Sequence, residues 1–464
     1  MDAQRSEYPA GHVVVSGNRI AAAGPGPAPA DIPGGPGGPG GEAGGEAGGG
    51  SGGVLRSGGS GFRLVDASGC LATPGFVNTH HHLYQWATRG CAADSTLFDW
   101  LTELYPVWAR IDEQIVADSA TAALAWLART GCTTTTDHHY VFPRGGGDVL
   151  GATVQAARSV GLRFHPTRGS MDLGASAGGL PPEEVVEDID SILAATSAAI
   201  DRFHDPSPGS MLRMGVAPCS PFSVTGELMA AAAGLARDRG VRLHTHLAET
   251  IDEAAFCAER FGCTPAEYLD SLGWLGGDVW LAHAVHLDDK AIARMAATGT
   301  GVAHCPSSNA RLGAGICRVA DLLAAGVPVG LGVDGAASNE ETSLAGEVRQ
   351  AVRMARAAGG PQALSVRQSL ELATLGGARC VGREDEIGSL EPGKLADIAL
   401  WRMDTLPHAN IADPVAALVL GAPAPLELLI VNGEVVVQRD QLATVDEHAV
   451  SAAAGRAAGA LRPG

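Results

Sequence analysis

The chain has 464 residues, of which 45% are hydrophobic and 18% charged, and its formal net charge is −19. This composition is typical of a globular protein, and its acidity argues against a nucleic-acid partner because like charges repel. No run of about 20 apolar residues is present, and the polar stretch from Met1 to Ala10 lacks the apolar core of a signal peptide. We therefore expect a cytoplasmic protein that binds neither nucleic acid nor a membrane.

Residues 11–23 predict a β-hairpin, with Val13, Val14 and Val15 in its first strand and a Ser-Gly-Asn turn before Ile20. The segment 24–61 is dominated by Gly, Pro, Ala and Ser. Its central run, Gly34–Gly53, cannot bury apolar surface, so we expect it to be disordered.

Short apolar strands alternate with helical patterns from residue 75 onward. Eight strands that alternate with helices predict a parallel sheet closed into a (β/α)8 barrel of the TIM type. The expected strands are 75–82, 132–138, 163–168, 212–219, 242–249, 279–285, 299–305 and 328–334. The expected helices are Ser119–Arg129, Glu183–Arg202, Gly226–Arg239, Asp288–Ala297, 343–358 and 366–380.

The pattern returns to short β-strands after Gly388. Three apolar runs follow, and the last two flank Asn432-Gly433, which is a strong hairpin signal. Because strands flank the barrel on both sides in sequence, we expect residues 1–73 and 386–464 to form one small β-sandwich. The segment 24–61 would be an insertion in it, and residues 74–385 would form the catalytic barrel.

The first expected barrel strand ends in three histidines, His80, His81 and His82. Successive side chains of a strand point to opposite faces, so His80 and His82 should project together, away from His81. Two imidazoles on one face provide half of a metal site. A triplet of this kind also fits a polar turn with surface histidines, so the other strand ends decide between the two interpretations.

Catalytic groups of such barrels lie at the carboxyl ends of the strands. Here the fifth strand ends with His244, His246 and Glu249, the sixth with His283, and the eighth with Asp334. Several imidazoles together with carboxylates suit a catalytic Zn²⁺ or Fe²⁺ that keeps an open position for water. Further histidines near strand ends are expected to be structural, namely His138, His139, His165 and His304, and His286 is given no catalytic role.

Five motifs together resemble the amidohydrolase superfamily, in particular its cytosine/guanine deaminase and s-triazine hydrolase branch. They are PGFVNTHHH, HTHLAE, LAHAVHLD, HCPSSNARLGAGI and GVDGAASN. The resemblance implies one divalent metal, with Zn²⁺ expected and Fe²⁺ as the alternative. It also implies the site residues, which are His80, His82, His246 and Asp334 as metal ligands, His283 beside the metal, and Glu249 as the proton shuttle.

In that family, metal-bound hydroxide attacks a ring carbon that bears an amino group. Glu249 would protonate the adjacent ring nitrogen, while Asp334 and His283 accept the proton of the water. Some members hold two metals with a carboxylated lysine at the end of the fourth strand. The only lysines here are Lys290 and Lys394, neither near that position, so we expect one metal and deamination rather than ring opening.

Within that branch, the stretches 81–85, 167–171 and 217–223 resemble the 8-oxoguanine deaminases, as do residues 97–101 and 105–108. This resemblance implies hydrolysis of 8-oxoguanine to urate and ammonia. The expected substrate contacts are Gln85 and Arg168 with purine carbonyls, Trp86 stacked on the base, and Cys219 lining the pocket. Each has a structural alternative: Arg168 could pair with a carboxylate, Trp86 could belong to the core, and Cys219 could be an apolar filler.

Other functions remain open at this point. One alternative is an aminohydrolase of s-triazines such as hydroxyatrazine, and others are a guanine or isocytosine deaminase. A non-catalytic scaffold of the same fold is disfavoured because the ligand set is complete. The resemblance also suggests a homo-oligomer. The family usually opens with one more strand before the hairpin, which suggests a start codon placed too far downstream or a sandwich that is one strand short.

Overall fold

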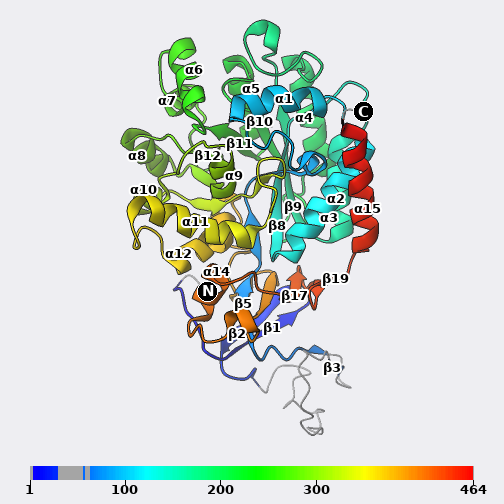
Figure 1. The fold of residues 1–464 in the computed structure, drawn as a ribbon, viewed down its shortest axis with the longest axis vertical. Helices are drawn as coiled ribbons and strands as arrows, with labels where there is room; N and C mark the ends of the chain where they lie inside the picture. Colours follow the sequence, from blue (N-terminus) through cyan, green and yellow to red (C-terminus); the bar gives the residue numbers. More distant parts are fainter. Residues whose placement is uncertain (1–3, 30–55, 58–62, 463–464) are drawn as a thin grey trace.

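The structure is a computed structural model that describes residues 4–29, 56–57 and 63–462. A helix-covered barrel forms its larger part, and a smaller layer of antiparallel strands lies below the barrel in Figure 1. The expectation of disorder in Gly34–Gly53 falls outside the described residues. Within the described residues, no helix is long and apolar enough to cross a membrane.

Eight parallel strands form a closed ring, which confirms the predicted (β/α)8 barrel. Each strand pairs with the next in sequence, and the last returns to the first where Leu331 lies opposite Asn78. All eight predicted strands are present. They are β6 (Phe76–Asn78), β8 (Cys132–His139), β9 (Arg163–Ser170), β10 (Gly215–Pro218), β11 (Arg242–Leu247), β12 (Val279–His283), β13 (Gly301–His304) and β14 (Val329–Leu331).

The first and last predicted strands are each divided in two. After β6 the chain leaves the barrel ring, and the short strand β7 (His81–His82) pairs instead with β15 (Asp334–Gly335). Asn78 stabilises this exit, because its side chain donates to Thr135 Oγ1 and accepts from the backbone N–H of Val333. The step therefore places the histidine triplet directly beside Asp334.

Most of the α-helices begin at a residue whose side chain caps the first turn. The predicted helix 183–202 begins only at Ile189, because Asp188 accepts the backbone N–H of Ser191 and caps it there. The α-helices are α1 (Leu97–Trp108), α2 (Glu113–Arg129), α3 (Val149–Val160), α4 (Ile189–Phe203), α5 (Gly226–Asp238), α6 (Ile251–Phe261), α7 (Pro265–Ser271), α8 (Asp289–Thr298), α9 (Pro306–Arg311), α10 (Val319–Ala324), α11 (Leu344–Gly359), α12 (Val366–Glu371), α13 (Gly377–Cys380), α14 (Pro414–Leu420) and α15 (Glu447–Leu461). Shorter helical turns are η1 (Leu83–Thr88), η2 (Ala175–Ala177), the π-helix η3 (Leu372–Gly376) and η4 (Leu406–His408).

The small layer combines strands from both sides of the barrel in sequence, as predicted. Its five-stranded sheet has the order β19-β18-β17-β16-β5, and Asn432 and Gly433 form the predicted turn with φ of 52° and 86°. A hairpin packs on this sheet through Ile20, Ile398 and Leu428. The strands of the sheet are β5 (Cys70–Pro74), β16 (Ile398–Arg402), β17 (Leu426–Val431), β18 (Glu434–Gln438) and β19 (Gln441–Leu442). The hairpin is β1 (Gly11–Ser16) with β2 (Arg19–Pro25), and β3 (Arg56–Ser57) pairs with β4 (Arg63–Leu64).

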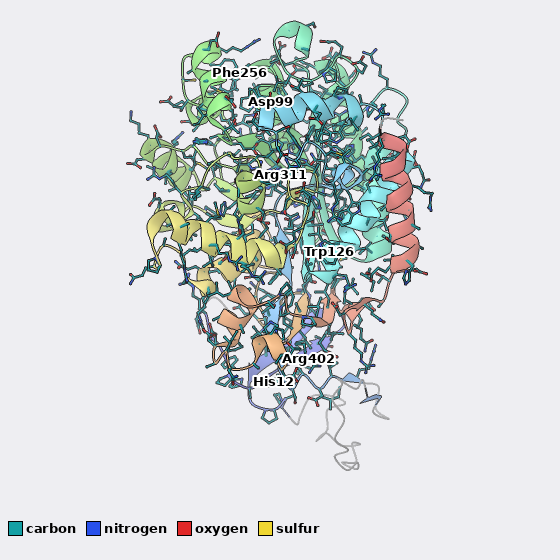
Figure 2. The ribbon with its side chains drawn as sticks, viewed as in Figure 1. His12, Asp99, Trp126, Phe256, Arg311 and Arg402 are labelled. Atoms are coloured by element: carbon teal, nitrogen blue, oxygen red, sulfur yellow. The ribbon has the colours of Figure 1, made fainter. Side chains whose placement is uncertain are left out.

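The last helix, α15, packs against α2 and η1 of the barrel rather than on the small sheet (Figure 1). Arg129 of α2 holds this end of the chain through ion pairs with Asp440 and Glu447. Residues 447–461 thus pack on the barrel, although they were expected in the small domain. The predicted boundary between the two domains at residue 386 stays a prediction. Trp126, labelled in Figure 2, lies on the outer face of α2 and donates to the backbone carbonyl of Glu341.

Candidate active site

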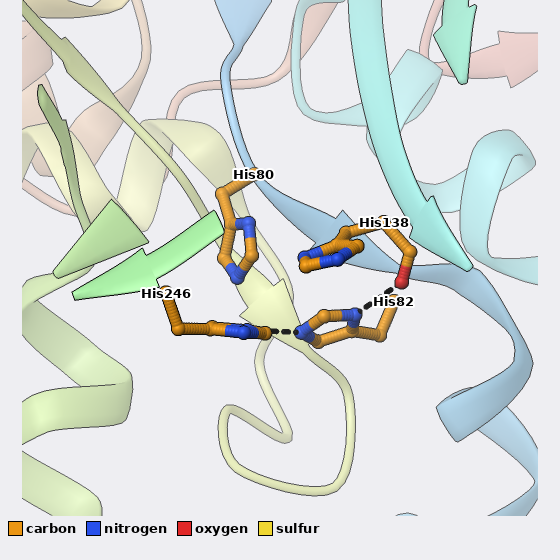
Figure 3. A group of neighbouring side chains, drawn as sticks. All are labelled: His80, His82, His138 and His246. Carbon is orange, nitrogen blue, oxygen red and sulfur yellow. Dashed lines mark hydrogen bonds between the residues drawn. The ribbon is translucent and has the colours of Figure 1, made fainter. Parts of the chain in front are cut away.

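Three imidazoles and one carboxylate meet at the carboxyl end of the barrel. His80 follows β6, His82 lies in β7, His246 in β11 and Asp334 in β15. Asp334 Oδ1 lies 3.2 Å from Nε2 of His80 and 3.3 Å from Nε2 of His82, and Nε2 of His82 lies 3.1 Å from Nε2 of His246. The structure thus brings together all four predicted ligands, and Figure 3 shows the three rings converging.

Hydrogen bonds at Nδ1 orient each of these rings. His82 Nδ1 donates to the carbonyl of His138 at 2.7 Å, and His246 Nδ1 donates to the carbonyl of Cys219 at 2.6 Å. His80 Nδ1 lies 2.7 Å from Nε2 of His244. His244 in turn donates from its own Nδ1 to the carbonyl of Trp280, so its Nε2 accepts from His80. All three ligand candidates therefore carry their proton on Nδ1 and present a lone pair at Nε2.

This arrangement fits a bound cation. The neutral rings of His82 and His246 place two lone pairs 3.1 Å apart, and Nε2 of His80 is buried with no hydrogen-bond partner among the described residues. A positive ion between these nitrogens and Asp334 removes that repulsion. Three imidazole nitrogens and a carboxylate oxygen are a donor set that suits Zn²⁺. The four residues would hold the ion, and none of them needs to change its tautomer to do so.

Asp334 is held by two hydroxyl groups. Ser308 Oγ donates to its Oδ2 at 2.5 Å, and Ser338 Oγ approaches the same oxygen at 3.1 Å. The second carboxylate oxygen, Oδ1, is thereby left facing the imidazoles. Hydroxyl groups that donate to a metal-binding carboxylate in this way fix its orientation.

Glu249 and His283 lie side by side next to this cluster. Glu249 Oε2 is 3.6 Å from Nε2 of His283, and its Oε1 has no hydrogen-bond partner in the described part of the chain. Burial, reinforced by the charges of Asp334 and Glu253, raises the pKa of Glu249 well above its ordinary value. A carboxyl group whose pKa is raised in this way suits general acid catalysis. Asn309 Nδ2 donates to Nδ1 of His283 at 3.0 Å, which leaves the proton of the neutral ring on Nε2, facing Glu249.

The backbone at these strand ends adopts the left-handed conformation, which is uncommon for residues with a side chain. The φ angles are 51° for Ala248, 72° for His283, 51° for Ala284 and 61° for Asp334. Glu253 stabilises the first of these turns by accepting the N–H groups of Ala248 and Glu249. The strained positions turn Glu249, His283 and Asp334 toward one pocket.

A narrow pocket with a largely apolar wall lies beside this cluster, and the space within it, including the part open to solvent, is about 370 Å³. Of the four predicted substrate contacts, the structure places Gln85 and Cys219 in this pocket. Its lining residues are His82, Gln85, Leu97, Trp100, Leu101, Tyr105, Tyr140, Cys219, Phe222, His246, Glu249, His283, Leu312, Asp334 and Ser338. Arg311, labelled in Figure 2, holds α9 near the pocket by donating to the carbonyls of Cys91 and Ala92.

Neither Trp86 nor Arg168 lines this pocket in the structure, so both substrate contacts stay predictions. Trp86 follows Gln85 on the tight turn η1 and points into an outer groove, where Arg89 covers its ring at 4.2 Å. Arg168 forms a two-point ion pair with Glu187 and stacks on Phe142. The ion pair is the structural alternative that the sequence offered for Arg168, whereas Trp86 is partly buried and is not a core residue.

Several site residues were missed by the sequence reasoning. Tyr105 and Ser338 line the pocket, and Ser308 and Asn309 orient Asp334 and His283; all lie in stretches already singled out for their resemblance. His138 was expected to be structural. It does donate to the carbonyl of Ala217, yet it also stacks on His246 with ring centres 4.7 Å apart, and its Nδ1 lacks a partner within the described chain.

Comparison with known proteins places these features in context. A model described as the amidohydrolase family matches residues 71–436. An 8-oxoguanine deaminase from Pseudomonas aeruginosa is 47% identical over 370 residues, covering 79% of this chain and 82% of the relative. A hydroxydechloroatrazine ethylaminohydrolase from Pseudomonas sp. (strain ADP) is 38% identical over 404 residues, covering 85% of this chain and 83% of the relative. Among solved structures, an atrazine chlorohydrolase from Arthrobacter aurescens TC1 complexed with zinc superposes with a TM-score of 0.87 at 32% identity, covering 98% of this chain and 97% of that one.

Proposed function

Because the chain belongs to the amidohydrolase family, we propose that it is a metal-dependent hydrolytic deaminase that converts 8-oxoguanine and water to urate and ammonia. One observation supports the reaction class: three imidazole lone pairs and a carboxylate converge beside the buried carboxyl group of Glu249. The choice of substrate is supported by the 47% identity to an 8-oxoguanine deaminase. The partner of the chain is then a small, uncharged heterocycle.

The metal that we propose is zinc, held by His80, His82, His246 and Asp334. The atrazine chlorohydrolase with the same fold was solved with zinc, and the tautomers found here leave three nitrogens free for such an ion. When bound, a divalent ion lowers the pKa of a water molecule toward about 7 and so provides a nucleophile at neutral pH.

The residues around this position divide the proton transfers between them. Asp334 and His283 hold the attacking water, and Asp334 takes up its proton. Glu249 gives its proton to the ring nitrogen next to the attacked carbon, so that the tetrahedral intermediate carries no isolated charge on the ring. The proton held by Asp334 then passes to the departing amine, and the hydroxyl proton of the intermediate returns to Glu249. Ammonia leaves, and the ring carbon is left as a carbonyl.

One alternative substrate class is favoured by specific observations. The chain is 38% identical to a hydroxydechloroatrazine ethylaminohydrolase and closely resembles a triazine hydrolase in fold. A triazine is also a flat ring with an exocyclic amine, so the same proton transfers would serve it. The two proposals differ in the ring that the apolar pocket accepts.

The test is ammonia release from a panel of heterocycles by the purified chain with its metal content measured. We expect about one zinc or iron per chain, loss of activity with a chelator, and a large preference in kcat/KM for 8-oxoguanine over guanine, isocytosine and hydroxytriazines. His246→Ala should lose both the metal and the activity. A preference for a hydroxytriazine would replace the proposed substrate, and full activity without metal would contradict the mechanism.

A further inference from the structure

Besides Glu249, two polar side chains in the catalytic pocket form no hydrogen bond of ordinary geometry among the described residues. They are Gln85, whose amide lies beside the Tyr84 hydroxyl group, and Tyr105, whose hydroxyl group lies beside the Cys219 thiol. Both side chains are buried, with at most 1% of Tyr105 exposed. Buried polar groups are normally hydrogen-bonded, because an unmade bond costs stability. Unpaired groups that line a pocket therefore indicate atoms of a bound ligand.

Gln85 lies on the metal side of the pocket. Its amide is pressed so closely against Gly335, next to Asp334, that a Cβ on that glycine would lie 1.7 Å from Oε1. A glutamine amide presents a donor and an acceptor side by side. It therefore pairs with a lactam edge, in which a ring N–H adjoins a carbonyl. In 8-oxoguanine such an edge adjoins the carbon that carries the amine.

Tyr105 lies on a different wall. It belongs to α1, which covers the carboxyl end of the barrel and carries none of the metal ligands (Figure 1). Its ring is fixed edge-on against Trp108, with ring centres 5.9 Å apart. The Cys219 thiol is its polar neighbour, and sulfur is a weak hydrogen-bond partner. The phenol is thus a rigid donor that still needs an acceptor.

Resting on the proposed function, we propose that Tyr105 is a specificity-determining residue whose hydroxyl group donates to the carbonyl at the edge of the purine remote from the amine. The Gln85 amide pairs with the lactam edge near the metal. The 8-oxo group then lies at the opposite edge of the purine, where the Tyr105 hydroxyl can donate to it. A site with an unpaired donor rejects an analogue that lacks the acceptor. Guanine has hydrogen in place of that carbonyl, so Tyr105 would help to exclude it.

The test compares Tyr105→Phe with Tyr268→Phe. Tyr268 is a matched control, because its hydroxyl is also buried without a partner in the described structure, but it lies on α7 and does not line the pocket. For Tyr105→Phe we expect kcat/KM for 8-oxoguanine to fall roughly tenfold, mainly through KM, while guanine changes less than about twofold. Urate should inhibit this variant about tenfold more weakly. Tyr268→Phe should leave both substrates unaffected.

Melting temperature and metal content distinguish a specificity role of the Tyr105 hydroxyl from a purely structural one. Removing an unpaired buried hydroxyl should leave the melting temperature and the metal content unchanged or raise the melting temperature. An equal loss for 8-oxoguanine and guanine, a loss that accompanies a lower melting temperature, or unchanged kinetics would each overturn the inference while the proposed deaminase stands. A wild-type chain inactive on the whole panel would overturn both.

Discussion

The position of the ring proton decides what each histidine can do at this site. His80, His82 and His246 each donate a hydrogen bond from Nδ1 to a nearby acceptor, so the lone pair of Nε2 is free to bind a metal. His283 is reversed, because Asn309 donates to its Nδ1 and leaves the proton on Nε2. His283 therefore suits a role as a hydrogen-bond donor beside the metal rather than a ligand. The sequence shows these residues as identical imidazoles, and only their neighbours separate them.

At this same scale, Glu249→Gln tests the proton transfer. The substitution keeps the shape of the side chain but removes its acidic proton, so turnover of 8-oxoguanine should fall by roughly two to four orders of magnitude. Metal content and the binding of urate should be preserved, since Glu249 is not among the proposed ligands. Steady-state kinetics with metal analysis measure both. Near-normal turnover would assign the proton transfer to another residue.

At the scale of elements, one buried carboxylate joins two of the motifs that carry the site. Glu347 on α11 accepts the N–H of Ser307 at the start of α9 and the side-chain amide of Asn339, which follows the turn after β15. The helix α9 carries Ser308 and Asn309, the partners of Asp334 and His283. Glu347 thus fixes the position of these two catalytic groups relative to each other without contacting either.

Glu347→Ala should therefore impair both stability and catalysis. It leaves the half-buried N–H of Ser307 and one buried N–H of the Asn339 amide unpaired, at a cost of about 1–3 kcal/mol each, and releases α9 from the turn after β15. We expect a lower melting temperature together with a lower kcat for 8-oxoguanine, and a partial rescue by Glu347→Gln, which keeps one acceptor. Glu341→Ala, at an exposed position nearby, is the control and should change neither quantity. A normal kcat in Glu347→Ala would show that α9 is held by other contacts.

The sequence predicts the elements better than the directions of their side chains. The strands follow from apolar runs, and the proposed metal ligands were identified from motifs at the strand ends. The division of the first strand into β6 and β7 depends on hydrogen bonds of Asn78 to distant strands, which no local pattern encodes. Likewise, consecutive residues of η1 face different sides, so that Gln85 enters the pocket while Trp86 does not.

At the scale of the whole molecule, a buried ion pair joins the barrel to the small sheet. Arg163 at the start of β9 contacts both oxygens of Asp397, just before β16, at 3.2 Å, and both side chains are almost fully buried. Asp397 also accepts the N–H of Asn432 in the β17–β18 turn. Arg163 further donates to the carbonyls of Gly209 and Ser210. The pair therefore fixes how the two layers are docked.

Asp397→Asn should destabilise the protein strongly, because it leaves the charge of Arg163 buried and unpaired. We expect a loss of about 3–5 kcal/mol in the free energy of unfolding, measured by urea denaturation. The double variant Arg163→Met with Asp397→Leu should lose less than Asp397→Asn alone. Asp270→Asn, in the exposed pair with Arg294, should have little effect. Equal losses from Asp270→Asn and Asp397→Asn would show that the docking of the two layers does not depend on this pair.

The pairing of β7 with β15 has a consequence for how the protein acquires its metal. The first proposed ligand is residue 80 and the last is residue 334, and β15 reaches β7 only at the point where the barrel ring closes. At 5–20 residues per second, the ribosome needs roughly ten to fifty seconds to make the chain between them. The proposed ligand set is therefore incomplete on the nascent chain until Asp334 has been made, and an ion that arrives earlier meets at most the three histidines of the set.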